Sequence, residues 1–210
     1  MKSFIITGTD TEIGKTLVSA LLVKALNASY WKPTQSGLED ETDTEFVKRV
    51  SGCSDDRIIP EAFRLTQPLS PHISSVKDGI QIELDDFNLP EFQTETLIIE
   101  GAGGVLVPLN WKTLQIDLFK KLNVPVVVIA RTKLGTINHT LLTLEALRNR
   151  EIPIHGVILN GNFNLENRNS IEKIGKVKIL GWVPPLQQIS AEILQSVFDQ
   201  HFDKNDWIKS

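Results

Sequence analysis

The feature that most constrains the fold is a loop between a β-rich run and a helical run. Residues 3–7, Ser-Phe-Ile-Ile-Thr, have the β-branched and aromatic content of a strand. Residues 16–25 carry Leu and Ala at roughly helical spacing. The connecting stretch, residues 8–16, reads Gly-Thr-Asp-Thr-Glu-Ile-Gly-Lys-Thr. A strand that enters a helix through such a loop can surround a polyphosphate with backbone N–H groups and the helix N-terminus.

Each residue type in this loop suits phosphate binding. Lys15 would place a charge on the β- and γ-phosphates, and the Thr16 hydroxyl would reach Mg²⁺. The loop departs from the strict pattern, because five residues separate Gly8 from Gly14 and Thr9 replaces the first glycine. The alternative is a chance Gly-Lys-Thr at a helix start, which the flanking strand and helix disfavour. The candidate nucleotide ligands in the loop are Glu12, Ile13, Gly14, Lys15 and Thr16.

The rest of the chain alternates short apolar runs with segments of helical period. Strands are predicted at 28–31, 96–100, 125–130, 157–160 and 177–180. Helices are predicted at 114–122, 136–149 and 191–202. The polar, proline-containing stretch 39–93 is expected to be helix and loop. This alternation predicts an α/β fold in which one domain, residues 1–210, has a mostly parallel sheet with helices on both faces.

Composition excludes several classes of protein. The net charge of −4 argues against a nucleic-acid surface, which needs a basic excess. The chain has a single cysteine, Cys53, so it can form no intramolecular disulfide, which fits a reducing compartment. The apolar run at 4–6 is too short for a signal peptide, and no run approaches the length of a membrane span. We therefore expect a cytoplasmic protein.

Two acidic positions are candidates for a metal site. Glu100 ends the predicted strand 96–100 and precedes the glycine-rich residues 101–104, where P-loop proteins place a metal-binding carboxylate. The alternative is a solvated strand end. Asp43 lies in the acidic run 39–45, and such runs are usually the solvated start of a helix. Nothing within the run separates Asp43 from its acidic neighbours.

Taken together, five motifs resemble those of the dethiobiotin synthetase family, in order and spacing, over roughly the first 160 residues. These motifs are residues 8–16, Lys32-Pro33 with Ser36-Gly37, Ser70-Pro71-His72, Glu100–Gly104, and Lys133-Leu134-Gly135 with Ile137-Asn138-His139. The lengthened phosphate loop is itself a feature of that family. The resemblance implies a P-loop ligase that uses ATP and Mg²⁺ to close a cyclic urea on 7,8-diaminononanoate with CO₂ or bicarbonate.

The resemblance also implies a role for individual residues. Lys15 and Lys32 are the implied catalytic residues, and Thr16, Asp43 and Glu100 the implied Mg²⁺ ligands. The diamine or its carbamate would contact Thr11, Ser36 and Gly103. Across a homodimer interface, the substrate carboxylate would meet Leu134, Gly135 and Asn138. Nucleotide contacts beyond the phosphate loop are implied for Asp43, Glu100, Gly101, Ala102, Gly103, Asn160, Gly161, Val183, Pro184 and Pro185.

Other interpretations compete with this one. Without the family, Lys32 would be an ordinary surface lysine and residues 133–138 an ordinary strand-to-helix turn. His72 and His139 are expected to be structural, and Cys53 incidental. A cobyrinate-type amidase domain, a ParA/MinD-like switch ATPase and a plain nucleotide-binding module are the alternatives. The loop interior lacks the second lysine typical of the switch ATPases, which argues against them.

Overall fold

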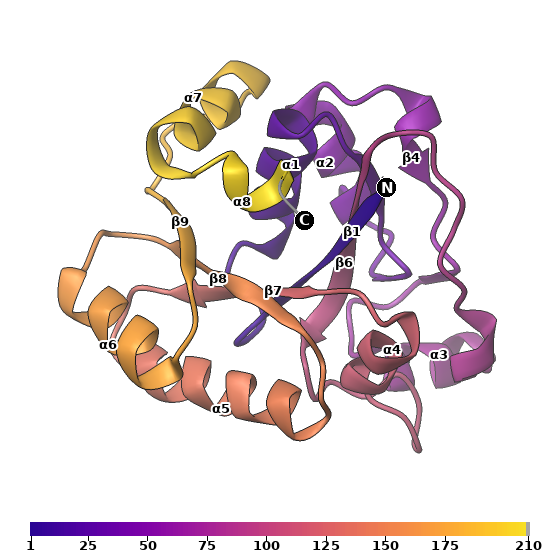
Figure 1. Ribbon diagram of the computed structural model, residues 1–210. Helices are drawn as coiled ribbons and strands as arrows, with labels where there is room; N and C mark the ends of the chain where they lie inside the picture. Colours follow the sequence, from indigo (N-terminus) through magenta and orange to yellow (C-terminus); the bar gives the residue numbers. More distant parts are fainter. Residues whose placement is uncertain (209–210) are drawn as a thin grey trace.

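Seven parallel strands form the sheet at the centre of the protein (Figure 1). This computed structural model describes residues 1–208, and the strand order is β4-β2-β6-β1-β7-β8-β9. The strands are β1 (Lys2–Gly8), β2 (Ser29–Trp31), β4 (Ile58–Ile59), β6 (Thr96–Gly104), β7 (Val126–Arg131), β8 (Ile154–Asn160) and β9 (Ile179–Val183). Every neighbouring pair in this sheet is parallel, which confirms the predicted α/β class.

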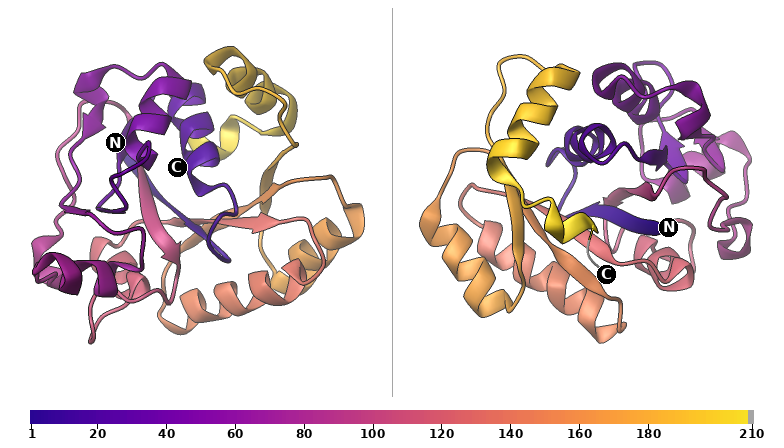
Figure 2. Two further views of the ribbon diagram at one scale, coloured as in Figure 1. Left: turned by 180° about the vertical axis from the view of Figure 1, so that it is seen from behind. Right: turned by 45° about the horizontal axis from the view of Figure 1, so that its top comes forward.

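Helices cover both faces of the sheet, as predicted (Figure 2). One face carries α1 (Lys15–Ala25), α2 (Asp43–Ser51) and α7 (Ala191–His201). The other carries α4 (Gln115–Leu122), α5 (Thr136–Asn149) and α6 (Leu165–Gly175). The remaining elements are a second sheet of β3 (Thr34–Ser36) and β5 (Phe63–Leu65), α3 (Pro71–Asp78), α8 (Asn205–Ile208) and the 3₁₀ turns Asp55–Arg57 and Leu84–Asp86.

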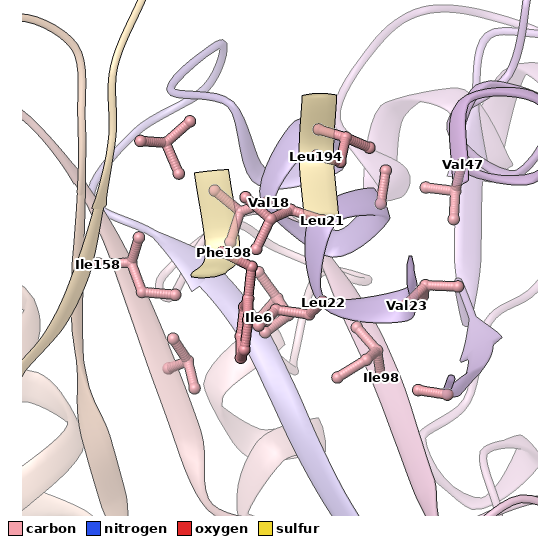
Figure 3. Packing of buried hydrophobic residues seen from close by; sticks show 14 of the residues in the cluster. Ile6, Val18, Leu21, Leu22, Val23, Val47, Ile98, Ile158, Leu194 and Phe198 are labelled. Atoms are coloured by element: carbon pink, nitrogen blue, oxygen red, sulfur yellow. The ribbon is translucent and has the colours of Figure 1, made fainter. Parts of the chain in front are cut away.

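The central strand β1 explains why its sequence is a continuous apolar run. Successive side chains of a strand point to opposite faces, so Ile5 and Ile6 enter different cores. Figure 3 shows Ile6 beneath α1, whose Leu21 and Leu22 pack into the same core as Leu194 of α7. Both isoleucines are fully buried. The strand is therefore fixed from both sides, and the loop that follows it has a rigid base.

Several element boundaries differ from the predictions. The strand expected to stop at residue 100 continues to Gly104. Its backbone runs close to the Phe119 ring, and only glycine fits at position 101, because a Cβ there would lie 2.8 Å from that ring. The strand expected at 177–180 is β9, which reaches Val183. Helix α6 was not predicted, because its sequence is mostly polar and buries little. The stretch 39–93 holds the strands β4 and β5 as well as helix and loop.

The parallel arrangement brings the informative loops together. The carboxyl ends of β1, β2 and β6 lie side by side at one edge, because these strands pair directly in the sheet. Ligands of open α/β sheets bind at this edge. Within residues 1–208, no helix combines the length and the apolar character needed to cross a membrane.

Candidate active site

The loop after β1 is held in place from two sides. The Thr9 N–H donates to the carbonyl oxygen of Ile129 at 3.1 Å, and the Asn160 side-chain amide donates to the carbonyl oxygen of Ile13 at 2.8 Å. Gly14 has φ +90°, and a Cβ there would lie 2.1 Å from the Asn160 amide nitrogen. Glycine is therefore required at this position by both the backbone conformation and the contact with β8.

The side chain of Lys15 folds back into the phosphate loop that precedes it. Its side chain is buried, and its Nζ donates to the carbonyl oxygen of Asp10 at 3.2 Å. Burial lowers the pKa of Lys15, although the carboxylates of Glu100 and Asp43 partly oppose that shift. The ammonium group thus sits beside the backbone N–H groups of the loop, where a phosphate would meet both.

Three oxygen-bearing side chains converge beside the first turn of α1. The Thr16 Oγ1 lies 2.6 Å from Oδ1 of Asp43 and 3.0 Å from Oε1 of Glu100. Glu100 is fully buried, so the solvated strand end considered for it is wrong. Hydroxyl and carboxylate oxygens are the ligands that Mg²⁺ prefers, and Mg²⁺ in phosphate sites typically takes only one or two carboxylates.

Lys32 joins the two carboxylates of this cluster. Its Nζ lies 2.5 Å from Oδ2 of Asp43 and 3.0 Å from Oε1 of Glu100, and only 4% of Lys32 is exposed. An ordinary surface lysine is therefore excluded. Burial by itself lowers the pKa of Lys32, but the two carboxylates outweigh it and the net pKa is raised. Burial likewise raises the pKa of Asp43, but Lys32 outweighs it and the net pKa is lowered.

The contacts at the start of α2 distinguish Asp43 from its acidic neighbours. Thr42 caps the helix by accepting from the Glu45 N–H, and the Glu45 carboxylate accepts from the Thr42 N–H. Glu41 is exposed and pairs with Arg49 at 2.6 Å. Asp43, the first residue of the helix, is left to face Thr16 and Lys32. The run is thus a helix start, as its composition indicated, and one member of it also joins the cluster.

A cavity of 780 Å³ opens next to this cluster. It is lined by Thr11, Glu12, Gly14, Lys15, Thr16, Lys32, Thr34, Ser36, Asp43, Pro68, Leu69, Ser70, Pro71, Glu100, Ala102, Gly103 and Val107. The hydroxyl oxygens of Thr34 and Ser36 are buried and have no hydrogen-bond partner among the described residues. Buried polar atoms without partners are uncommon and call for a ligand or water.

A second cavity, of 490 Å³, lies on the other side of the phosphate loop. Glu12, Ile13, Asn160, Gly161 and Pro185 line it, together with Arg131, Thr132, Lys133 and Asn162. Of the predicted residues 183–185, only Pro185 lines this cavity. Val183 ends β9 with its side chain in the core, and its carbonyl oxygen accepts from the Gly161 N–H at 3.0 Å. Gly101 is buried within β6 and lines neither cavity.

Comparison with known proteins decides between the interpretations. A family model described as an AAA domain matches residues 2–193. The ATP-dependent dethiobiotin synthetase of Rhodopseudomonas palustris (strain HaA2) is 49% identical over 208 residues, which cover 99% of this chain and 97% of that protein. The protein of the same name from Brucella ovis is 51% identical and covers 97% and 95%. This chain belongs to the dethiobiotin synthetase family.

Two solved structures resemble this chain in fold. The ParA family ATPase of Chlorobium tepidum superposes with a TM-score of 0.55 at 14% identity, covering 95% of this chain and 92% of that one. MinD of Pyrococcus horikoshii, solved with Mg-ADP, gives a TM-score of 0.55 at 14% identity, covering 94% and 92%. Identity this low carries the P-loop fold but not the switch function, whereas the synthetases match in sequence along nearly the whole chain.

The residues that the family resemblance assigned to a dimer interface lie apart from both cavities. Leu134, Gly135 and Asn138 surround the start of α5 and line neither of them. Gly135 is the N-terminal cap with φ +92°, and the Leu134 side chain is fully exposed. Next to them, the exposed His139 takes part in the helix ladder through its backbone N–H. A fully exposed leucine next to a helix N-terminus without a side-chain cap suits a contact with another molecule.

Two residues that touch the synthetase site carried no signal in the sequence analysis. Arg131, at the end of β7, donates to the carbonyl oxygen of Thr11 at 2.6 Å and so braces the phosphate loop. Tyr30, in β2, donates its hydroxyl to Oε2 of Glu100 at 2.9 Å. An arginine at a strand end and a tyrosine inside a strand are common, so neither could have been selected without the topology that brings these strands beside the loop.

Proposed function

We propose that this protein forms dethiobiotin from 7,8-diaminononanoate, CO₂ and ATP, releasing ADP and phosphate. The observation that carries the proposal is the position of Lys32, a buried lysine held by Asp43 and Glu100 at the edge of the 780 Å³ cavity that Lys15 also lines. Phosphoryl transfer needs positioned positive charge more than covalent help. Two lysines on one cavity supply that charge.

The oxygen cluster fits a magnesium ion. Thr16, Asp43 and Glu100 would hold it, because the Thr16 hydroxyl already lies within hydrogen-bond distance of both carboxylates. When bound, Mg²⁺ would neutralise charge on the phosphate oxygens of ATP. The phosphates would lie along the N–H groups of residues 12–16, and the base would occupy the 490 Å³ cavity beside Asn160 and Gly161.

The proposed reaction has three steps. One amine of the substrate attacks CO₂ and loses a proton, which gives a carbamate. A carbamate oxygen then takes the γ-phosphoryl group of ATP, which gives a mixed anhydride and ADP. The second amine attacks the carbamate carbon, the ureido ring closes, and phosphate leaves. Lys32 and Lys15 would stabilise the charge that the transferred group carries, while Thr11, Ser36 and Gly103 would contact the diamine or carbamate.

We further propose that the protein acts as a homodimer in the cytoplasm, with residues 1–210 as one ligase domain and with no nucleic-acid or membrane partner. Leu134, Gly135 and Asn138 would complete the substrate site of the opposite subunit. Their exposure supports this, as does their absence from both cavities of their own chain. The free N–H groups at the start of α5 would suit the substrate carboxylate.

The deciding experiment measures phosphate release from Mg·ATP and bicarbonate, with and without 7,8-diaminononanoate, and identifies the organic product by mass. We expect phosphate release that depends on the diamine, with one dethiobiotin formed for each phosphate. ATP hydrolysis that is indifferent to the diamine, with no cyclic product, would overturn the proposal in favour of a switch ATPase.

A further inference from the structure

Tyr30 and Lys32 donate hydrogen bonds to different oxygens of the Glu100 carboxylate. Tyr30 lies in β2 and Lys32 directly follows that strand, two residues further on, and alternation along an extended chain sends such side chains to the same side. Lys32 Nζ lies 3.0 Å from Oε1 of Glu100, and the Tyr30 hydroxyl donates to Oε2 at 2.9 Å. The intervening Trp31 packs into the opposite core. The carboxylate of Glu100 therefore cannot rotate without losing a hydrogen bond.

From this contact we propose that Tyr30 is a positioning residue, which holds Oε2 of Glu100 so that Oε1 faces Thr16 and the phosphate loop. The proposal rests on the metal site of the proposed function, in which Glu100 is a ligand. Removing a partner that orients a ligating carboxylate typically lowers metal affinity or activity about 10- to 100-fold. Tyr30 would act on the magnesium ion through Glu100, without touching the ion or the substrate.

The surroundings of Tyr30 keep it a hydrogen-bond donor. Its side chain is fully buried, and Oε2 of Glu100 accepts its hydroxyl proton. Its ring packs within the hydrophobic core under α1. Among the described residues, the Tyr30 hydroxyl donates to Oε2 of Glu100 and to no other acceptor.

A purely structural role is the alternative, since a buried tyrosine ring also fills the core. Tyr30→Phe separates the two roles, because phenylalanine keeps the ring and removes only the hydroxyl. The matched control is Trp31→Phe, on the same strand but facing the opposite core. That substitution removes the hydrogen bond from Trp31 Nε1 to the Pro60 carbonyl oxygen, 3.1 Å long, and leaves Glu100 untouched.

The test measures ADP affinity by calorimetry, with and without Mg²⁺, in the wild type and both variants. In Tyr30→Phe we expect the affinity for ADP alone to be unchanged. The factor by which Mg²⁺ raises the affinity for ADP should be about tenfold smaller than in the wild type. The Mg²⁺ concentration for half-maximal phosphate release should rise by a similar factor. In Trp31→Phe the midpoint of thermal unfolding should fall, while the Mg²⁺ dependence stays that of the wild type.

A second measurement asks whether Tyr30 acts through Glu100. If it does, Tyr30→Phe has no further effect on the Mg²⁺ dependence in a Glu100→Gln background, because coupled residues are not additive. A Tyr30→Phe variant with the magnesium dependence of the wild type overturns the inference and leaves the proposed function standing. A wild type whose ADP affinity ignores Mg²⁺ overturns the proposed metal site itself, and the two failures are thereby distinguished.

Discussion

The charge cluster of Lys15, Lys32, Asp43 and Glu100 and the exposed start of α5 are both assigned to substrate chemistry, yet they are built in opposite ways. The charge cluster lies at the carboxyl ends of paired strands, and its lysines and Glu100 are buried. At the start of α5, Leu134 and Asn138 are exposed within their own chain, and Leu134 is fully exposed. The charge cluster is complete within a single chain, whereas the start of α5 would take part in a site only in the proposed homodimer.

This difference follows from what each region must do. Charges that stabilise a transferred phosphoryl group act most strongly where water is excluded, so they need a rigid sheet edge around them. Residues that complete another subunit's site must project outward, and in one chain they cannot be distinguished from ordinary surface. The comparison can be tested at the charge cluster, at the start of α5, and at the cavity proposed for the base.

The largest effect is expected at Lys32. Lys32→Ala should lower the rate of dethiobiotin formation by a factor of about 10²–10³, because it removes positive charge aimed at the transferring group. The affinity for ADP without Mg²⁺ should stay close to that of the wild type, since within residues 1–208 the ion pairs and hydrogen bond of Lys32 go to Asp43 and Glu100 and none goes to the phosphate loop. Single-turnover product formation and calorimetry measure the two quantities separately.

The same substitution leaves Asp43 and Glu100 without their common cation. Removing one partner of a buried ion pair costs about 3–5 kcal/mol, so the nucleotide-free protein should be clearly less stable. Lys48→Ala is the matched control, because Lys48 pairs with Asp55 on the surface. That variant should keep both stability and turnover. Wild-type turnover in Lys32→Ala would show that the buried cluster is structural.

The next effect is expected at the start of α5. Asn138→Ala should raise the KM for the diamine about tenfold, the cost of one hydrogen bond to a charged carboxylate, and leave nucleotide binding unchanged. Mixing this variant with Lys32→Ala tests the subunit arrangement. Each mixed dimer would have one intact site of two, about one in four of all sites after random pairing of equal amounts, so activity at low diamine concentration should reappear on mixing. No recovery on mixing would mean that each chain completes its own site.

Most of the fold follows from the pattern of apolar runs, and the errors have physical causes. The strands buried on both faces, such as β1 and β7, were located within about two residues, because few other structures bury a short continuous apolar run. Helix α6 was missed because it packs with only a few apolar side chains. The short strand β5 was missed because it pairs only with β3, a partner that no local pattern in the sequence reveals.

The candidate site was predictable where a backbone motif carries it. Gly14 and Lys15 are fixed by local conformation, so the sequence predicts their positions directly. Asp43 needed the family resemblance, and only the structure shows why it differs from Glu41, which pairs with Arg49 instead. Tyr30 could not be found, because its link to Glu100 spans 70 residues of sequence and exists only when β2 pairs with β6.

The smallest effect is expected at Asn160, in the 490 Å³ cavity proposed for the base. It tests how far this cavity differs from the buried charge cluster. The Asn160 side chain already donates to the Ile13 carbonyl oxygen at 2.8 Å, so it both lines the cavity and steadies the phosphate loop. Asn160→Ala removes one neutral hydrogen bond, worth about 1 kcal/mol, and should raise the KM for ATP about fivefold with little change in the maximal rate.

Steady-state kinetics with ATP and with GTP or CTP measure the effect. If Asn160 contacts the base, the preference for ATP should narrow; if it only steadies the loop, all nucleotides should weaken equally. A fall in the maximal rate as large as that of Lys32→Ala would place Asn160 with the buried charge cluster and remove the distinction between the two regions.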